Sequence, residues 1–135
     1  MFFSIVIPIY NEEFNINLLV DEIYNSLNNF NSKFEIVLVD DSSEDKSLQI
    51  INELSKQNPK IVKVVKNNKN LGQSLSLLKG IEYSSYQTII TIDGDGQNNP
   101  QDIPFLIDKF FSDKSISLVG GIRKKRKDSI VKIIS

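Results

Sequence analysis

Two aspartates separated by a single glycine stand out in the second half of the chain, where residues 93–97 read Asp-Gly-Asp-Gly-Gln. Carboxylate and amide oxygens suit a hard divalent cation, and Mg²⁺ needs only one or two carboxylates when phosphate oxygens and waters complete its shell. We expect Asp93, Asp95 and Gln97 to lie on one side of an extended segment, with the glycines allowing close approach and unusual backbone angles. The alternative is a hairpin turn, for which Asp-Gly is a common signal. Asn99-Pro100 argues against the hairpin, because this pair is typical of a helix start.

Two further acidic segments follow apolar runs earlier in the chain, one reading Pro-Ile-Tyr-Asn-Glu-Glu and the other Asp-Asp-Ser-Ser. Three acidic loop ends at one sheet edge would repel one another unless a cation lay among them. Tyr10 has a flat face that can stack on a base, and Glu12 or the Asp40-Asp41 pair can accept hydrogen bonds from ribose hydroxyls or a base N–H. The alternative for Asp41 and Ser42 is ordinary turn and capping chemistry, which is about as common.

Two other segments carry weaker signals. By residue type, Asn70 to Ser74 is best interpreted as an ordinary loop entering a helix. Arg123 follows two glycines, so its guanidinium can meet a phosphate, although a solvated basic run is the commoner outcome. The residues after 121 are strongly basic, whereas the rest of the chain is acidic. Composition alone does not rank a solvated face, a nucleic-acid patch or a phosphate-binding surface.

The composition limits which chemistry is available. The chain has 135 residues, with 17 acidic and 16 basic side chains, 40% hydrophobic residues, and neither cysteine nor histidine. Disulfide frameworks, thiolate or imidazole metal sites and a histidine base are therefore excluded, so oxygen must hold any metal. No apolar run approaches the roughly 20 residues that span a bilayer, and the N-terminus lacks the basic region of a signal peptide. We expect a cytoplasmic polypeptide.

The elements that must position these residues can be predicted from the apolar pattern. Short β-rich runs alternate with amphipathic stretches, which is typical of βαβ units around a mainly parallel sheet. The sequence therefore predicts an α/β fold, a three-layer αβα sandwich forming one domain over residues 1–135. In such sheets, ligands bind outside the carboxyl ends of the strands, where the acidic segments fall. The predicted strands are 3–9, 34–39, 61–65, 88–92 and 117–120.

Helices are predicted between these strands from apolar residues at helical spacing. One such set is Leu71, Leu75 and Leu78, and Ser43 is expected to cap the helix that follows the second strand. The apolar residues from Ile130 to Ile134 indicate the opening of another amphipathic helix. Because the chain stops inside that pattern, we expect it to be a fragment.

Five ordered pieces of the chain together resemble the inverting family 2 glycosyltransferases of GT-A fold. Within that family they are similar to the polyprenyl-phosphate branch, which includes dolichyl-phosphate mannose synthase and undecaprenyl-phosphate sugar transferases. The resemblance spans almost the whole chain, although acceptor-site and C-terminal membrane helices of this branch are absent. The pieces are residues 4–13, 35–43, 70–73, 93–100 and 120–129.

The resemblance also implies roles for individual residues. The metal, Mg²⁺ or Mn²⁺, is expected on Asp93 and Asp95, which match the family's DXD element, and on Gln97. Arg123 matches an arginine that contacts donor phosphate, and Lys132 is the nearest match to a later basic residue with the same role. The residues that the resemblance places around the nucleoside are Pro8, Tyr10, Glu12, Asp40 and Asp41.

The implied reaction transfers a hexosyl group, with inversion, from a UDP-sugar or GDP-mannose to a polyprenyl phosphate at the inner membrane face. Asp95 with its metal, and Arg123, would stabilise charge on the leaving diphosphate. A phosphate nucleophile is already ionised, so no protein base is required, in keeping with the absence of histidine. The alternative acceptor is a glycan hydroxyl, which would need a carboxylate base. UDP is favoured by the likeness to the bacterial branch.

Two other classes of protein share parts of this pattern. A nucleotidyltransferase also uses acidic metal ligands and a nucleotide, but it usually carries a glycine-rich basic loop after its first strand, and residues 8–13 contain neither glycine nor lysine. A nucleic-acid or lipid-binding module would use the basic residues near the end of the chain. That interpretation leaves the three acidic loop ends unexplained, because they would repel phosphate. We therefore expect no nucleic-acid partner.

Overall fold

The computed structural model describes residues 1–123 and 129–134, and for residues 120–123 and 129–134 it describes the backbone alone. The contacts divide the chain into a first unit, Met1–Asp21 with Asn31–Asn98, and a second unit, Glu22–Phe30 with Asn99–Ser135. None of the helices described is both long and apolar enough to cross a membrane. The elements are β1 (Phe2–Ile9), α1 (Ile16–Leu27), β2 (Lys33–Asp40), α2 (Ser47–Gln57), β3 (Val62–Lys66), α3 (Gln73–Tyr83), β4 (Ile89–Thr91), η1 (Pro100–Asp102), α4 (Ile103–Ser112), β5 (Leu118–Arg123) and β6 (Ser129–Ile134).

The first unit is built on a four-stranded sheet in the order β3-β2-β1-β4. All three pairings are parallel, and β1 and β2 run side by side over eight residue pairs, from Phe2 with Lys33 to Ile9 with Asp40. Helices connect the strands, as parallel pairing requires. The predicted α/β class and mainly parallel sheet are confirmed, and the carboxyl ends of all four strands lie at one edge, which we call the carboxyl edge.

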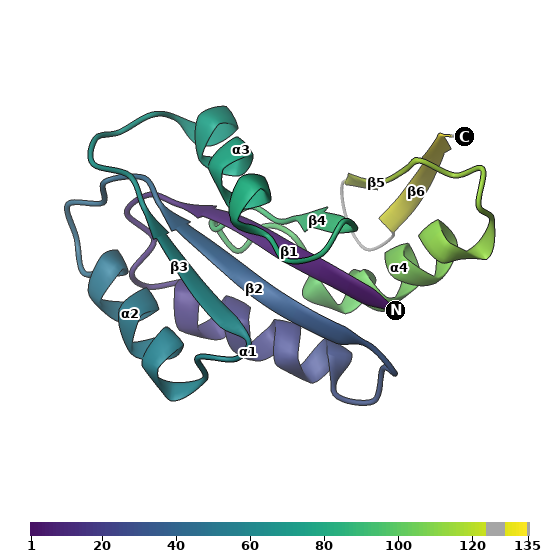
Figure 1. Ribbon diagram of the computed structural model, residues 1–135, viewed down its shortest axis with the longest axis horizontal. Helices are drawn as coiled ribbons and strands as arrows, with labels where there is room; N and C mark the ends of the chain where they lie inside the picture. The colour runs from purple at the N-terminus through teal and green to yellow at the C-terminus, as the bar shows by residue number, and fades with distance from the viewer. Residues whose placement is uncertain (124–128, 135) are drawn as a thin grey trace. The chain divides into compact units, whose positions relative to one another are not determined.

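The two faces of the sheet bury different side chains, because successive residues of a strand point to opposite faces. Val6, Val37, Val39 and Val65 form a buried cluster on one face, against which Leu77 of α3 packs. The isoleucines that alternate with Val6 along β1 are fully buried as well. Figure 1 shows α3 over one face of the sheet and α2 over the other, so the three-layer αβα arrangement is confirmed.

Helix α3 faces the sheet with Leu77 and its small residues and not with Leu75 and Leu78. The leucine spacing correctly predicted a helix, but Leu75 and Leu78 are 49% and 55% exposed, whereas Ser76 and Gly80 are buried. A Cβ on Gly80 would collide with the side chain of Val6 and lie 2.9 Å from Cγ2 of Val39. The close approach that glycine permits therefore decides which side of α3 meets the sheet, and the prediction that Leu75 and Leu78 cover it was wrong.

The second unit contains the helical segment after residue 99 and a two-stranded sheet. Asn99 accepts a hydrogen bond from the backbone N–H of Gln101 at 3.1 Å, with Pro100 at the first helical position, which confirms the predicted helix start. Strand β5 pairs antiparallel with β6 in this second sheet, so the prediction that it joins the parallel sheet was wrong. The helix predicted over 130–134 is also wrong, because the β-branched residues there form strand β6.

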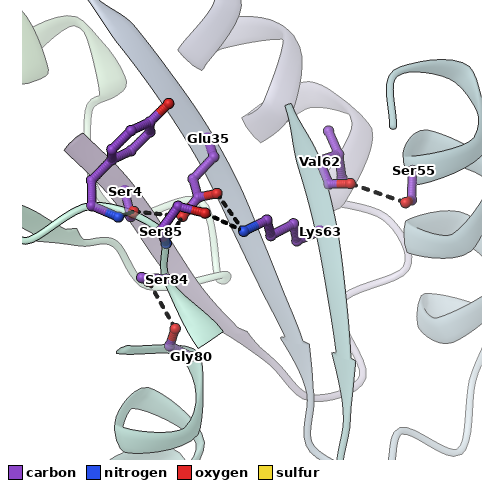
Figure 2. Close-up of polar contacts among 9 residues, drawn as sticks. Ser4, Glu35, Ser55, Val62, Lys63, Gly80, Ser84 and Ser85 are labelled. Carbon is purple, nitrogen blue, oxygen red and sulfur yellow. Dashed lines mark hydrogen bonds and ion pairs between the residues drawn. The ribbon is translucent and has the colours of Figure 1, made fainter. Parts of the chain in front are cut away.

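A closed polar cluster lies at the opposite, amino edge of the parallel sheet (Figure 2). Glu35, only 4% exposed, accepts hydrogen bonds from the Ser4 hydroxyl at 2.6 Å and from the backbone N–H of Ser85 at 2.5 Å, and it pairs with Lys63 at 2.8 Å. Burial by itself raises the pKa of Glu35, but these partners more than offset it, so the pKa lies below its ordinary value of 4.5. The cluster ties three strands to the loop between α3 and β4.

Candidate functional site

A cleft of about 480 Å³ opens at the carboxyl edge of the sheet, within the first unit. Its volume falls in the range of roughly 300–1,000 Å³ that is typical of small-molecule sites. It collects residues from the loops after β1, β2, β3 and β4, as parallel sheets require. We call it the acidic cleft, and its lining residues are Pro8, Ile9, Tyr10, Glu12, Asp41, Asn70, Gly72, Gln73, Asp93, Gly94 and Asp95.

The loop after β1 is fixed by hydrogen bonds to the segment after β2. Asn11, with a positive φ of 51°, donates its backbone N–H to the Ser43 hydroxyl at 3.1 Å, and its side chain accepts from the backbone N–H of Glu44 at 2.8 Å. The Ser47 hydroxyl accepts from the backbone N–H of Glu12 at 2.8 Å. The prediction that Ser43 caps the next helix was wrong, because α2 begins four residues later and Ser43 holds the β1 loop instead. Tyr10 is left half exposed at the rim of the acidic cleft.

Of the two adjacent aspartates at the end of β2, only Asp41 lines the acidic cleft. It is 4% exposed, and its oxygens accept from the backbone N–H groups of Leu71 at 2.7 Å and Gly72 at 2.9 Å. The side-chain amide of Asn67 also donates to it at 2.9 Å. Burial raises the pKa of Asp41, yet these donors more than offset it, so the pKa lies below the ordinary 3.8. Asp41 therefore holds the loop that starts α3.

The other aspartate, Asp40, is 1% exposed and is not among the residues that line the acidic cleft. Its Oδ2 accepts from the backbone N–H of Ser43 at 3.3 Å. Its Oδ1 is buried without a hydrogen-bond partner in the described part of the chain. Its predicted contact with a nucleoside stays a prediction.

The segment after β4 brings two carboxylates into the acidic cleft. A Cβ on Gly94 would lie 2.8 Å from Cδ1 of Ile9 and 2.9 Å from the carbonyl oxygen of Pro8, so only glycine allows the loop to come this close to β1. Gly96 has a positive φ of 74°. Both expected uses of glycine are confirmed, whereas the extended geometry was wrong, because the chain turns at Gly94 and Asp95. The hairpin alternative was wrong as well, since η1 follows the turn, with no strand between them.

Each of the two carboxylates is held by one hydrogen bond. Oδ1 of Asp95 accepts from the backbone N–H of Gln97 at 3.0 Å, and Oδ1 of Asp93 accepts from the side-chain amide of Gln73 at 2.7 Å. The backbone N–H of Asp93 donates to the Asn98 side chain at 2.8 Å. Among the described residues, Oδ2 of each aspartate has no hydrogen-bond partner. One oxygen of each therefore remains available to a ligand.

The segment that enters α3 contributes more to the acidic cleft than its residue types indicate. The prediction of an ordinary loop over residues 70–74 is wrong in this respect, because Asn70, Gly72 and Gln73 line the acidic cleft and Gln73 contacts a predicted metal ligand. Gly72 has a positive φ of 87°, which turns the chain into the helix. The available signal was an Asn-x-Gly segment between a strand and a helix, at the edge where loops converge.

For three predicted site residues the structure gives no test of the predicted contact. Gln97 is not among the residues that line the acidic cleft, and its contribution to a metal site stays a prediction. Arg123 ends β5, and Lys132 lies on β6 opposite Gly120, where the structure describes only the backbone. The basic residues 124–127 lie outside the described residues. The predicted phosphate contacts of Arg123 and Lys132 therefore also stay predictions.

The charged side chains described in the acidic cleft are all negative. Glu12, Asp41, Asp93 and Asp95 line it, and no lysine or arginine is among its lining residues within residues 1–119, where the structure describes side chains. Across the described residues, no group of three or more acidic side chains is close enough to hold a metal alone. Two carboxylates with free oxygens nevertheless fit Mg²⁺ or Mn²⁺, because Mg²⁺ takes the remaining ligands from phosphate and water. A cation that arrives with a diphosphate matches this donor set.

Comparisons with known proteins give relatives both in sequence and in fold. Residues 4–132 match the sequence profile of Glycosyl transferase family 2. An undecaprenyl-phosphate 4-deoxy-4-formamido-L-arabinose transferase from Edwardsiella ictaluri is 36% identical over 128 residues, which are 95% of this chain and 39% of that protein. The chain thus spans about two fifths of the length of the curated relatives it matches.

Two solved structures are similar in fold. A mannosyltransferase from Pyrobaculum calidifontis in complex with GDP-Man and Mn²⁺ has a TM-score of 0.72 and 21% identity, covering 84% of this chain and 33% of that one. S. aureus TarS 1–349 in complex with UDP has a TM-score of 0.57 and 29% identity, covering 82% and 33%. The parallel sheet with flanking helices is therefore the GT-A arrangement that was expected.

Proposed function

The chain belongs to glycosyl transferase family 2, and from that premise we propose that the acidic cleft binds a nucleoside-diphosphate sugar together with Mg²⁺ or Mn²⁺. The observation that carries the proposal is the negative charge of the cleft, where Asp93 and Asp95 each keep a free oxygen and no basic side chain among residues 1–119 lines the wall. A diphosphate is repelled by such a wall unless a cation lies between them. Complexes of similar folds with GDP-Man and Mn²⁺, and with Mg²⁺ and UDP, support this choice of ligand.

Different residues are proposed to contact the base, the ribose, the cation and the phosphates of the donor. Tyr10 stacks on the base, and Glu12 accepts from a ribose hydroxyl. Asp93 and Asp95 hold the cation through their free oxygens, with Gln97 as a further candidate ligand. When bound, the cation neutralises charge that develops on the leaving diphosphate. Arg123 and Lys132 are proposed to contact the donor phosphates, so that Asp95 and Arg123 are the residues that assist departure of the diphosphate.

For the whole reaction, we propose transfer of the glycosyl group to a polyprenyl phosphate, with inversion, at a membrane surface. Relatives that are 36% and 37% identical to this chain are named undecaprenyl-phosphate transferases, which supports this acceptor. A phosphate acceptor is already ionised, so in-line attack needs no protein base. UDP-sugars are the favoured donors, supported by the UDP complex of a similar structure at 29% identity. Metal dependence and donor identity are parts of the proposal.

Calorimetric titration tests the donor and the metal together. Wild-type protein and Asp95→Ala are titrated with UDP-glucose and with GDP-mannose, each with and without Mn²⁺. We expect binding that requires Mn²⁺, is tighter for UDP-glucose, and falls by about 10-fold or more in the variant, because one of two carboxylate ligands is lost. Binding that is independent of metal and unaffected by Asp95→Ala would contradict the proposal.

The acceptor is tested separately with radiolabelled UDP-sugars. The whole protein is incubated with undecaprenyl phosphate in detergent and, in parallel, with soluble glycan acceptors. We expect label in the lipid phosphate fraction alone. Label that is transferred only to glycan hydroxyls would overturn the acceptor assignment and leave the donor site intact.

A further inference from the structure

Gln73 links two loops of the acidic cleft that are far apart in the sequence. It is the first residue of α3, and its side-chain amide donates to Oδ1 of Asp93, in the loop after β4, at 2.7 Å. Both side chains line the acidic cleft. Asp95, by contrast, is held by the backbone N–H of Gln97 within its own turn. Asp93 is thus the carboxylate whose orientation depends on a distant side chain.

The start of α3 is itself held by hydrogen bonds to buried side chains. Asp41 accepts from the backbone N–H groups of Leu71 and Gly72, the two residues that precede Gln73. Asn67 donates to both Asp41 and the Ser76 hydroxyl at 2.9 Å, and Asn67 and Ser76 are fully buried. These bonds fix the backbone on both sides of position 73. Gln73 therefore reaches Asp93 from a rigid support.

A neutral amide is suited to orienting a metal ligand. It occupies one oxygen of the Asp93 carboxylate and leaves Oδ2 for a cation, without the positive charge with which a lysine would repel that cation. Resting on the proposed function, we infer that Gln73 is a positioning residue that fixes Asp93 for the divalent cation of the donor complex. It acts through Asp93 and does not contact the nucleotide.

The test separates metal affinity from nucleotide affinity. UDP binding to the 135-residue chain is measured by calorimetry without metal and over a series of Mn²⁺ concentrations, for wild type and Gln73→Met, which keeps the side-chain length but removes the donor. We expect the Mn²⁺ concentration that half-saturates the UDP complex to rise by about 10-fold, since partners of metal ligands typically contribute 10- to 100-fold. Metal-free UDP affinity and the melting temperature should be unchanged.

Two further variants sharpen the result. In Asp93→Asn, the additional change Gln73→Met should have no effect on Mn²⁺ affinity, because the carboxylate through which it acts is gone. The matched control is Gln49→Met, which removes a glutamine amide that donates to Glu53 at 3.2 Å on the exposed surface of α2 and should leave Mn²⁺ affinity unchanged.

Three outcomes would overturn the inference, and they can be told apart. If wild type binds UDP with Mn²⁺ and Gln73→Met does so equally well, the positioning role is wrong while the proposed function stands. If Gln73→Met weakens metal-free UDP binding, the residue contacts the nucleotide directly. If wild type shows no metal-linked UDP binding, the proposed function fails and the inference fails with it.

Discussion

The carboxylates at the two edges of the parallel sheet have opposite surroundings. At the amino edge, Glu35 is paired with Lys63 and receives hydrogen bonds from Ser4 and Ser85, so its charge and its oxygens are satisfied within the protein (Figure 2). At the carboxyl edge, Asp93 and Asp95 each keep an oxygen without a partner among the described residues. A paired carboxylate stabilises a fold, whereas an unpaired one is available to a ligand.

Asp41 is intermediate between Glu35, whose oxygens are all satisfied and whose charge is paired, and the two aspartates with a free oxygen. It lies at the carboxyl edge and lines the acidic cleft, but its charge is stabilised by neutral N–H donors and by no cation among the described residues. Its oxygens are occupied, so it supports the cleft without offering a free ligand. The number of free oxygens, more than the number of acidic residues, therefore distinguishes a supporting carboxylate from a binding one.

Acid pH is expected to produce the largest change in stability, because it acts on both edges together. The folded-state pKa values of Glu35 and Asp41 lie below the ordinary 4.5 and 3.8. Their contribution to the free energy of unfolding is therefore fully present above about pH 4.5, and it is lost as the pH falls through the folded-state values. Chemical denaturation at a series of pH values should show stability falling steeply below pH 4.5. A constant free energy of unfolding down to pH 3 would show that the hydrogen bonds of Glu35 and Asp41 do not stabilise the folded protein.

Removing the cation of the amino edge should cost more stability than replacing a single aspartate at the carboxyl edge. Lys63→Met leaves the Glu35 carboxylate buried without its counter-charge, and we expect a loss of about 2–3 kcal/mol in the free energy of unfolding. This is below the usual cost of breaking a fully buried pair, because the Lys63 side chain is 38% exposed.

The double variant Lys63→Met with Glu35→Gln is the control for this prediction. It removes both charges, so it should recover most of the lost stability, as measured by urea denaturation. Equal losses in the single and the double variant would show that the charge of Glu35 is not the cause.

Much of the fold and of the acidic cleft was predictable from the sequence because the signals are local. Runs rich in Ile and Val mark the four strands of the parallel sheet, and Asn99-Pro100 marks a helix start. Since the carboxyl ends of parallel strands meet at one edge, the segments after β1, β2 and β4 were expected to converge, and they do. The glycines of the Asp93 segment were also correctly interpreted.

What could not be predicted depends on how elements pack on one another. Gln73 and Asp93 are twenty positions apart, and their contact requires the start of α3 to be anchored through Asp41. The leucine spacing of α3 could not reveal that Gly80 lets the opposite side of the helix meet the sheet. Glu35 lies within an apolar run, and its partner Lys63 comes from a different strand. Local patterns do not carry this information.

A smaller loss of stability is expected from Asp41→Asn, which tests the intermediate case. The amide nitrogen that replaces one carboxylate oxygen would face a backbone N–H, so one hydrogen bond of the loop is lost, at about 1–2 kcal/mol. Because this loop positions Gln73, Mn²⁺-linked UDP binding should weaken in the same variant. Urea denaturation and calorimetry check the two effects. Unchanged stability with weakened binding would indicate a direct ligand contact by Asp41.

The smallest expected effect has the opposite sign. Asp95→Asn removes a charge that lies among other carboxylates of the acidic cleft without a counter-ion among the described residues, so the metal-free protein should gain about 0.2–1 kcal/mol of stability. The gain should shrink at high salt, which screens exposed charges. With Mn²⁺ and UDP present, wild type should be more stable than Asp95→Asn, because the ligands stabilise only a protein that binds them. Thermal melts of both proteins, with and without the two ligands, measure this crossover. A variant less stable than wild type without metal would mean that Asp95 is structural, like Glu35, and the contrast between the two edges would then be wrong.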